Sequence, residues 1–271
     1  MSKRLPSFIA FTGLAYVISW AIWAPLWLPA LGVKGLPLLP FHHALGAIGP
    51  CLAAFIVVAI FEGRERVSDL ARRVIWPGPN LWFVSIAVLG PLGLLGLSIL
   101  VSWALGERAD ISELGTSSEF PRFSALAFFV YNVLSFGIGE EVGWRGFLLP
   151  RLQSRWNALA ATAIVTLIWA GWHAPLFLYR PGYVEMGWGG ALGWLVSLAT
   201  GAVLTTSLFN SSRGSVLVVA LFHAAIDVAF TGGASSPIAT NVAGALITGA
   251  GLVVVFRLGA RDLSRSGRVM L

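Results

Sequence analysis

The chain has 271 residues, of which 57% are hydrophobic and only 11% are charged, and its formal net charge is +6. A soluble domain of this size carries about 25% charged residues, so the polar surface is too small to cover a water-soluble globule. The composition excludes a soluble protein and points to the membrane.

Eight apolar runs follow one another along the chain, most of them long enough for a helix that crosses a bilayer core about 30 Å thick. None alternates between apolar and polar residues as the strands of a lipid-facing barrel do. We therefore expect an all-α, polytopic membrane protein with about eight transmembrane helices in a single integral-membrane domain, residues 1–271. The runs are 8–31, 43–61, 81–105, 123–148, 158–179, 190–209, 215–231 and 238–256.

The positive charges are shared unequally between the two sides of this arrangement. If the N-terminus is cytoplasmic and the spans alternate, 14 of the 18 Lys and Arg residues lie on the inner side when Arg145, which falls within a run, is counted with them, and 13 when it is not. This asymmetry follows the positive-inside rule and predicts that both termini are cytoplasmic. The basic charge then reflects topology and does not indicate a nucleic-acid partner. We expect a multi-pass protein of the plasma (inner) membrane. The four outer residues are Lys34, Arg108, Arg122 and Arg180.

The connections and isolated polar residues carry weaker signals. Residues 62–80 place apolar side chains at helical spacing between arginines, which fits either a short helix on the anionic inner leaflet or a solvated connector. His42 and His43, at the start of the second run, are expected at the interface without a functional role. Cys51 is the only cysteine, so it cannot form an internal disulfide, and we expect it to serve core packing.

Six ionisable residues lie well inside the runs, away from their ends, on only three of them. An ionisable group within the hydrocarbon costs several kcal/mol unless it is paired or hydrated, so it is by default a functional candidate. They are Glu140, Glu141 and Arg145 in the fourth run, His173 in the fifth, and His223 and Asp227 in the seventh.

The positions of these residues along their helices suggest a shared depth. Glu140 lies 15 residues from Arg155, and His173 lies 15 residues from Ala158. At 1.5 Å per residue, both are roughly 22 Å from the inner side. His223 and Asp227 are roughly 12 to 18 Å along their helix by the same measure, so one buried site can include them all.

Helical spacing separates the two glutamates. Glu141 and Arg145 are four residues apart and share a face, which predicts an ion pair. Glu140 is rotated by about 100° from Glu141, so it is free to face a cavity. A buried carboxylate without a cationic partner is a suitable general base.

The remaining residues repeat the four-residue spacing. His223 and Asp227 share one face, and Trp169 places an aromatic ring beside His173. Water between Glu140 and His173 would be the nucleophile, while His223 and Asp227 would orient the carbonyl or stabilise its oxyanion. An ionised Asp227 would repel that oxyanion, so Asp227 must be protonated, paired with His223 or bound to a cation.

Three short motifs resemble those of a known family. "EEVGWR" (140–145) is similar to the EExxxR motif of the type II CAAX-protease and bacteriocin-processing family of intramembrane endopeptidases. "WAGWH" (169–173) is similar to its FxxxH motif, and "HAAID" (223–227) to its HxxxN/D motif. The motifs occur in the family order, and the resemblance covers roughly residues 120–255, which would carry the catalytic core.

The resemblance implies hydrolysis of a peptide bond inside the membrane, in a CAAX-type or other membrane peptide. By motif position, Glu140 and His173 would activate water, and His223 with Asp227 would form the oxyanion side. Glu141, Arg145 and Trp169 would be supporting residues. The partners implied are a peptide or membrane-anchored protein substrate and the lipid bilayer.

Two departures from the family pattern affect this interpretation. Trp169 replaces the usual phenylalanine, and we expect it to change the shape of the cavity more than the chemistry. Asp227 stands where members acting on prenylated proteins have asparagine. The family has been described both as metalloproteases and as glutamate-dependent enzymes. We expect no cofactor, the alternative being a divalent metal such as zinc held by Glu140, His173 and His223, with Asp227 as a fourth ligand or a second-shell partner.

Two other classes of protein remain open. Buried Glu, His and Asp residues also relay protons in transporters and channels, where they are distributed across the membrane. A non-catalytic immunity or scaffold protein could retain the fold. Clustering of the six residues favours a reaction chamber over a transporter, and the complete Glu/His/His/Asp set argues against a non-catalytic protein.

Overall fold

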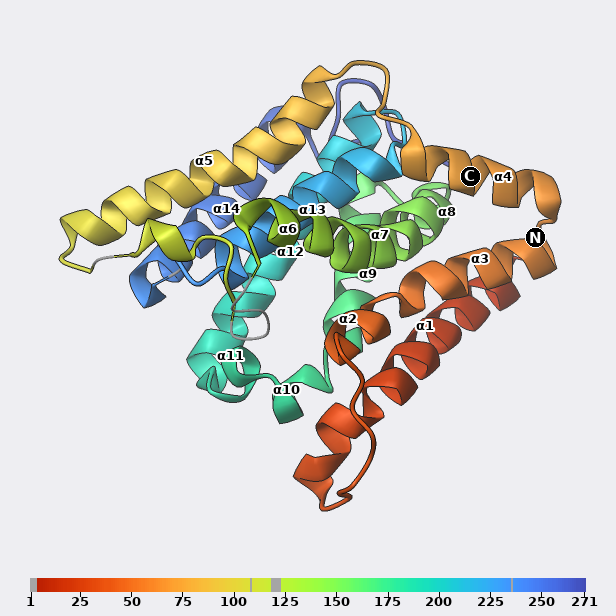
Figure 1. The fold of residues 1–271 in the computed structure, drawn as a ribbon. Helices are drawn as coiled ribbons and strands as arrows, with labels where there is room; N and C mark the ends of the chain where they lie inside the picture. The colour runs from red at the N-terminus through yellow and green to blue at the C-terminus, as the bar shows by residue number, and fades with distance from the viewer. Residues whose placement is uncertain (1–3, 108, 118–122, 235) are drawn as a thin grey trace.

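The computed structural model describes residues 4–107, 109–117, 123–234 and 236–271, which form a bundle of helices (Figure 1). Within these residues there is no β-strand, so the all-α prediction is confirmed. Lys3, Arg108 and Arg122, which enter the charge comparison above, lie outside the described residues. The helices in chain order are α1 (Arg4–Trp27), η1 (Leu28–Leu31), α2 (His42–Ala47), α3 (Gly49–Phe61), α4 (Arg64–Ile75), α5 (Trp82–Ala104), η2 (Ile111–Glu113), α6 (Ala125–Asn132), η3 (Val133–Gly137), α7 (Ile138–Glu141), η4 (Val142–Leu148), α8 (Leu149–Gln153), α9 (Ala158–Trp172), α10 (Leu176–Tyr179), α11 (Pro181–Val184), α12 (Gly187–Ser211), α13 (Val216–Thr231) and α14 (Pro237–Leu258).

Seven helical stretches of the described chain are long and apolar enough to cross a membrane, which makes the protein an integral membrane protein. The seventh predicted run differs, because α13 has only 16 residues. It packs against α5, α12, α6 and the segments from η3 to η4, so protein rather than lipid surrounds most of it. The long stretches are Pro6–Leu31, His42–Phe61, Trp82–Ala104, Ala125–Gln153, Ala158–Tyr179, Gly187–Ser211 and Pro237–Leu258.

The fourth span is not a uniform α-helix. The short α-helical segment α7 carries Glu140 and Glu141, and the π-helical segments η3 and η4 flank it on both sides. π-Helical turns are rare and occur frequently at functional sites. The unusual backbone of this span therefore coincides with the charged motif.

Glycines allow this span to lie close to its neighbours. A Cβ atom added at Gly143 would lie 2.6 Å from Pro50 Cβ on α3, and one added at Gly137 would lie 2.5 Å from the Ala220 carbonyl oxygen on α13. Small residues permit such close approach between membrane helices. Gly137 and Gly143 thus allow Glu140 and Glu141 to lie between α3 and α13.

The fifth span is interrupted next to its histidine. Helix α9 ends at Trp172, His173 forms its C-terminal cap, and α10 begins only after Pro175. Proline has no N–H group to continue the hydrogen bonds of the preceding turn. His173 therefore lies at a helix end and not in the middle of a regular helix.

The connection between the second and third spans contains the helix α4. Its Leu70 is buried and lies against Gly146 of η4, in a region where α4 also contacts α13. The helical alternative for residues 62–80 is confirmed, whereas contact of α4 with an anionic leaflet stays a prediction.

Candidate active site

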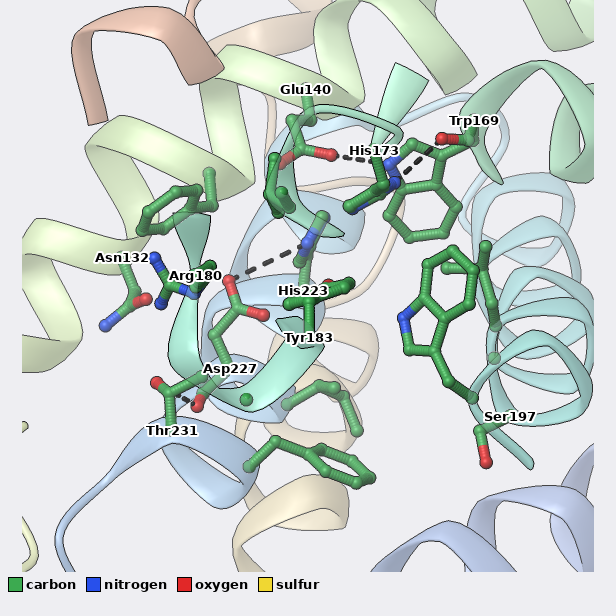
Figure 2. A pocket seen from close by; sticks show the side chains of 18 of the residues that line it. Asn132, Glu140, Trp169, His173, Arg180, Tyr183, Ser197, His223, Asp227 and Thr231 are labelled. Carbon is green, nitrogen blue, oxygen red and sulfur yellow. Dashed lines mark hydrogen bonds and ion pairs between the residues drawn. The ribbon is translucent and has the colours of Figure 1, made fainter. Parts of the chain in front are cut away.

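A cavity of about 370 Å³ lies within the bundle, and the residues proposed for catalysis line it (Figure 2). Glu140 comes from α7, His173 from the end of α9, and His223 and Asp227 from α13. The structure thus brings together residues from three separate spans. Most of the remaining lining is apolar or aromatic, including Phe136, Trp172, Tyr183, Met186, Trp194, Leu198, Leu204, Phe222, Ile226 and Phe230.

Neutral hydrogen-bond donors hold the carboxylate of Glu140. Its Oε2 atom accepts a hydrogen bond of 2.6 Å from Trp169 Nε1 and a longer one of 3.4 Å from Trp144 Nε1. The side chain is buried, and no ion pair to a cationic side chain is found for it among the described residues. Glu140 therefore faces the cavity without a cation to neutralise it.

The orientation of His173 follows from a hydrogen bond within its own helix. Its Nδ1 atom lies 2.7 Å from the backbone oxygen of Trp169. A carbonyl oxygen only accepts, so Nδ1 carries the proton and donates it, and Nε2 keeps its lone pair. The imidazole of His173 can then accept a hydrogen bond from water.

Trp169 consequently holds two residues at once, through its indole N–H and through its backbone carbonyl. Trp169 therefore does more than shape the cavity, and the effect of the tryptophan-for-phenylalanine exchange on the chemistry stays a prediction. A phenylalanine ring has no N–H group to donate to Glu140. The hydrogen bond crosses from α9 to α7, which sequence spacing cannot reveal.

Glu141 forms the expected ion pair and one further contact. Arg145 Nη1 lies 2.8 Å from Glu141 Oε1, and neither side chain is exposed. The same oxygen also lies 2.8 Å from His223 Nδ1 on α13. Glu141 is therefore both the partner of Arg145 and the support of His223.

Arg145 is held on its other sides as well. Its Nη2 atom donates to Thr205 Oγ1 of α12 at 2.6 Å. The guanidinium group lies over the Trp169 ring, 4.8 Å from its centroid. Cation–π contacts of this kind are favourable when the cation is desolvated. Arg145 thus links the fourth, fifth and sixth spans behind the cavity.

Asp227 lies beside the second nitrogen of His223. The distance between His223 Nε2 and Asp227 Oδ2 is 3.7 Å, which is an ion-pair distance but too long for a hydrogen bond. Of the three alternatives for Asp227, the geometry corresponds to pairing with His223.

The donor set does not fit the metal alternative. No group of three His, Cys, Asp or Glu side chains within the described chain is spaced to hold a metal ion. In addition, both nitrogens of His223 already face carboxylates, Glu141 at Nδ1 and Asp227 at Nε2. Coordination by Glu140, His173 and His223 would require these side chains to move.

The structure also adds residues that the sequence did not indicate. His43 is buried against Trp23 and lines the cavity, and its Nδ1 lies 2.6 Å from the Tyr179 hydroxyl. His43 is thus a buried residue of the cavity wall, whereas its depth relative to the membrane interface stays a prediction. Asn132 and Arg180 line the same cavity (Figure 2). The sequence predicts Arg180 in a connection on the outer side. It reaches this cavity because it lies between the short helices α10 and α11.

Comparison with known proteins agrees with the motifs. The family model for Rce1-like proteins, type II CAAX prenyl endopeptidases, matches residues 122–229. The chain is also similar to CAAX prenyl protease 2 of Methanococcus maripaludis, with 26% identity over 207 residues, covering 73% of this chain and 72% of that protein. The matched segment contains all four residues, Glu140, His173, His223 and Asp227, that line the cavity. The chain is therefore a membrane-embedded protease that is similar, over residues 122–229, to the Rce1-like type II CAAX prenyl endopeptidases.

Proposed function

We propose that this protein hydrolyses a peptide bond within the C-terminal CAAX segment of prenylated, membrane-anchored proteins. The cysteine of a CAAX sequence is the residue that carries the prenyl group. The names of both matches, which refer to CAAX prenyl proteases, support this substrate class. The apolar lining of the cavity also suits a lipid-modified peptide, and we place the reaction in the plasma (inner) membrane.

One observation carries the catalytic assignment: Trp169 holds the carboxylate of Glu140 and the imidazole of His173 at the same cavity wall. Water bound between Glu140 and His173 Nε2 would attack the scissile carbonyl carbon. Glu140 takes the proton as the new C–O bond forms. When the C–N bond breaks, the protonated Glu140 returns this proton to the leaving amine. General acid–base transfer of this kind contributes about 10²- to 10⁴-fold to a rate.

His223 would stabilise the oxyanion that forms on the carbonyl oxygen. For this task Nε2 must carry a proton, and Nδ1 must carry one as well because it donates to Glu141. The two carboxylates that flank the ring, Glu141 and Asp227, favour this doubly protonated form. Pairing with His223 also limits the repulsion between Asp227 and the oxyanion.

In this proposal no metal takes part, because no three His, Cys, Asp or Glu side chains of the described chain are spaced to hold an ion and both nitrogens of His223 face carboxylates. Electrostatic stabilisation is instead provided by fixed protein donors. The transporter and scaffold alternatives receive less support, because the ionisable residues gather around one cavity and are not distributed along a path.

Cleavage of a prenylated CAAX peptide by the purified protein in liposomes tests this function. We expect the wild type to release a short C-terminal peptide, identified by mass spectrometry, and Glu140→Gln to abolish the release while the protein remains folded. Glu62→Gln is the matched control, since Glu62 pairs with Arg151 away from the cavity. Wild-type turnover in Glu140→Gln would refute the general-base assignment, and no cleavage by the wild type would refute the substrate class.

A further inference from the structure

Arg180 occupies a special position in the cavity. It lies between α10 and α11 and is partly buried. Among the described residues that line the cavity, it is the one arginine or lysine. In Figure 2 it lies on the same side as Asn132 and on the side opposite Ser197. A positive charge is thus present in the lining of the chamber that contains the catalytic residues.

The other charged groups in this region are less suited to bind the carboxylate of a chain end, since the protonated His223 already faces Glu141 and Asp227. Glu140 and Asp227, which line the same cavity, would repel a carboxylate. Arg145 is fully buried in contacts with Glu141 and Thr205 and does not line the cavity. Arg180, by contrast, lies near enough to Asp227 and His173 for its charge to interact with both.

The proposed substrate brings a carboxylate close to this point. An endopeptidase that cuts within a four-residue C-terminal motif acts at most three residues from the free chain end. Each extended residue spans at most about 3.6 Å, so the terminal carboxylate lies within about 11 Å of the bond that is cut. A negative charge must therefore be accommodated in or beside a cavity that already holds two acidic residues.

We propose that Arg180 binds the C-terminal carboxylate of the substrate and thereby sets the distance from the chain end to the cleaved bond. This inference rests on the proposed function. A guanidinium group binds a carboxylate through two parallel hydrogen bonds. With five N–H donors, Arg180 can do so while keeping contacts to protein groups. The preference of the enzyme for substrates with a free C-terminal carboxylate would then depend on the Arg180 side chain.

Two prenylated peptides that differ only at the chain end test the proposal, one with a free carboxylate and one with a C-terminal amide. Hydrogen bonds to charged groups contribute about 1.5–3 kcal/mol. We therefore expect the wild type to cleave the amide with a kcat/KM lower by roughly 10- to 100-fold, mainly through KM. Arg180→Gln should lose a similar factor on the free acid and should no longer distinguish the two peptides.

Two further variants guard against an effect on folding. Arg180→Lys keeps the charge and should retain part of the preference for the acid, whereas Arg64→Gln on the exposed face of α4 should retain all of it. Equal cleavage of acid and amide by the wild type would overturn the proposal. So would an Arg180→Gln variant that is slower but still prefers the acid. Absence of cleavage of either peptide by the wild type would instead reject the proposed function and this inference with it.

Discussion

The side chains of Glu141 and His223, from the fourth and seventh spans, are joined by a 2.8 Å contact between Glu141 Oε1 and His223 Nδ1. The same oxygen receives Arg145 Nη1. Glu141 Oε2 and Arg145 Nε, however, have no hydrogen-bond partner among the described residues. A buried ion pair contributes little net stability unless its remaining atoms are satisfied. We infer that this pair is retained chiefly because it orients His223.

The variant Glu141→Gln should therefore affect both stability and turnover. Removing one charge of a buried ion pair leaves the other unpaired and costs roughly 3–5 kcal/mol. Thermal unfolding in detergent measures this loss. The folded fraction should also show a lower kcat, because an amide holds His223 more weakly than a carboxylate does. Unchanged turnover of the folded fraction would show that Glu141 serves Arg145 alone.

The variant Trp169→Phe isolates the indole N–H that holds Glu140. The ring and the backbone contact to His173 remain, so we expect KM to change little and kcat to fall by about 10-fold or more, the value of one hydrogen bond to a charged group. Trp172→Phe is the matched control, since the buried Trp172 Nε1 has no hydrogen-bond partner among the described residues. Similar kinetics for the two variants would contradict this role of Trp169.

The variant Asp227→Asn tests whether the negative charge at this position is required. The asparagine amide can donate a hydrogen bond to the oxyanion, which a carboxylate cannot do. We therefore expect Asp227→Asn to retain activity within about 10-fold, and Asp227→Ala to lose more because it has neither a charge nor a donor. Loss of one oxyanion donor typically costs about 10²- to 10³-fold in kcat. An Asp227→Asn variant as inactive as Glu140→Gln would show that the charge itself is essential.

Close packing of the fourth span can be tested with Gly143→Ala. The new methyl group would lie 2.6 Å from Pro50 Cβ and 2.8 Å from the Pro50 carbonyl oxygen, so α3 and η4 must separate. Thermal stability should fall, and overpacking of this kind typically costs about 1–3 kcal/mol. Gly96→Ala on α5 meets no atom within 4 Å and should leave stability unchanged or raise it slightly. Equal melting temperatures for Gly143→Ala and the wild type would contradict the packing argument.

Metal analysis tests the role of cofactors. Because His223 is held between two carboxylates, we expect purified active protein to contain no stoichiometric zinc and to keep its turnover after treatment with a chelator. A metal ion present at one equivalent, whose removal stops cleavage and whose return restores it, would refute the proposed mechanism.

The helices and the buried charges could be predicted from the sequence because each depends on residues close together along the chain. Apolar runs of membrane-spanning length give the helices, and a charge inside such a run, as at Glu140 or His223, stands out against its neighbours. Spacing along one helix also predicted the pair of Glu141 and Arg145, since residues four apart share a face.

Contacts between different spans depended on tertiary structure. The hydrogen bond from Trp169 to Glu140, the support of His223 by Glu141, and the entry of His43 and Arg180 into the cavity each join helices far apart in sequence. The periodicity of the sequence predicts which residues share one face of a helix. It does not predict which neighbouring helix that face packs against. That choice is made by packing, here through glycines such as Gly137 and Gly143 that allow the helices to approach, and it decided how the buried charges are arranged into a site.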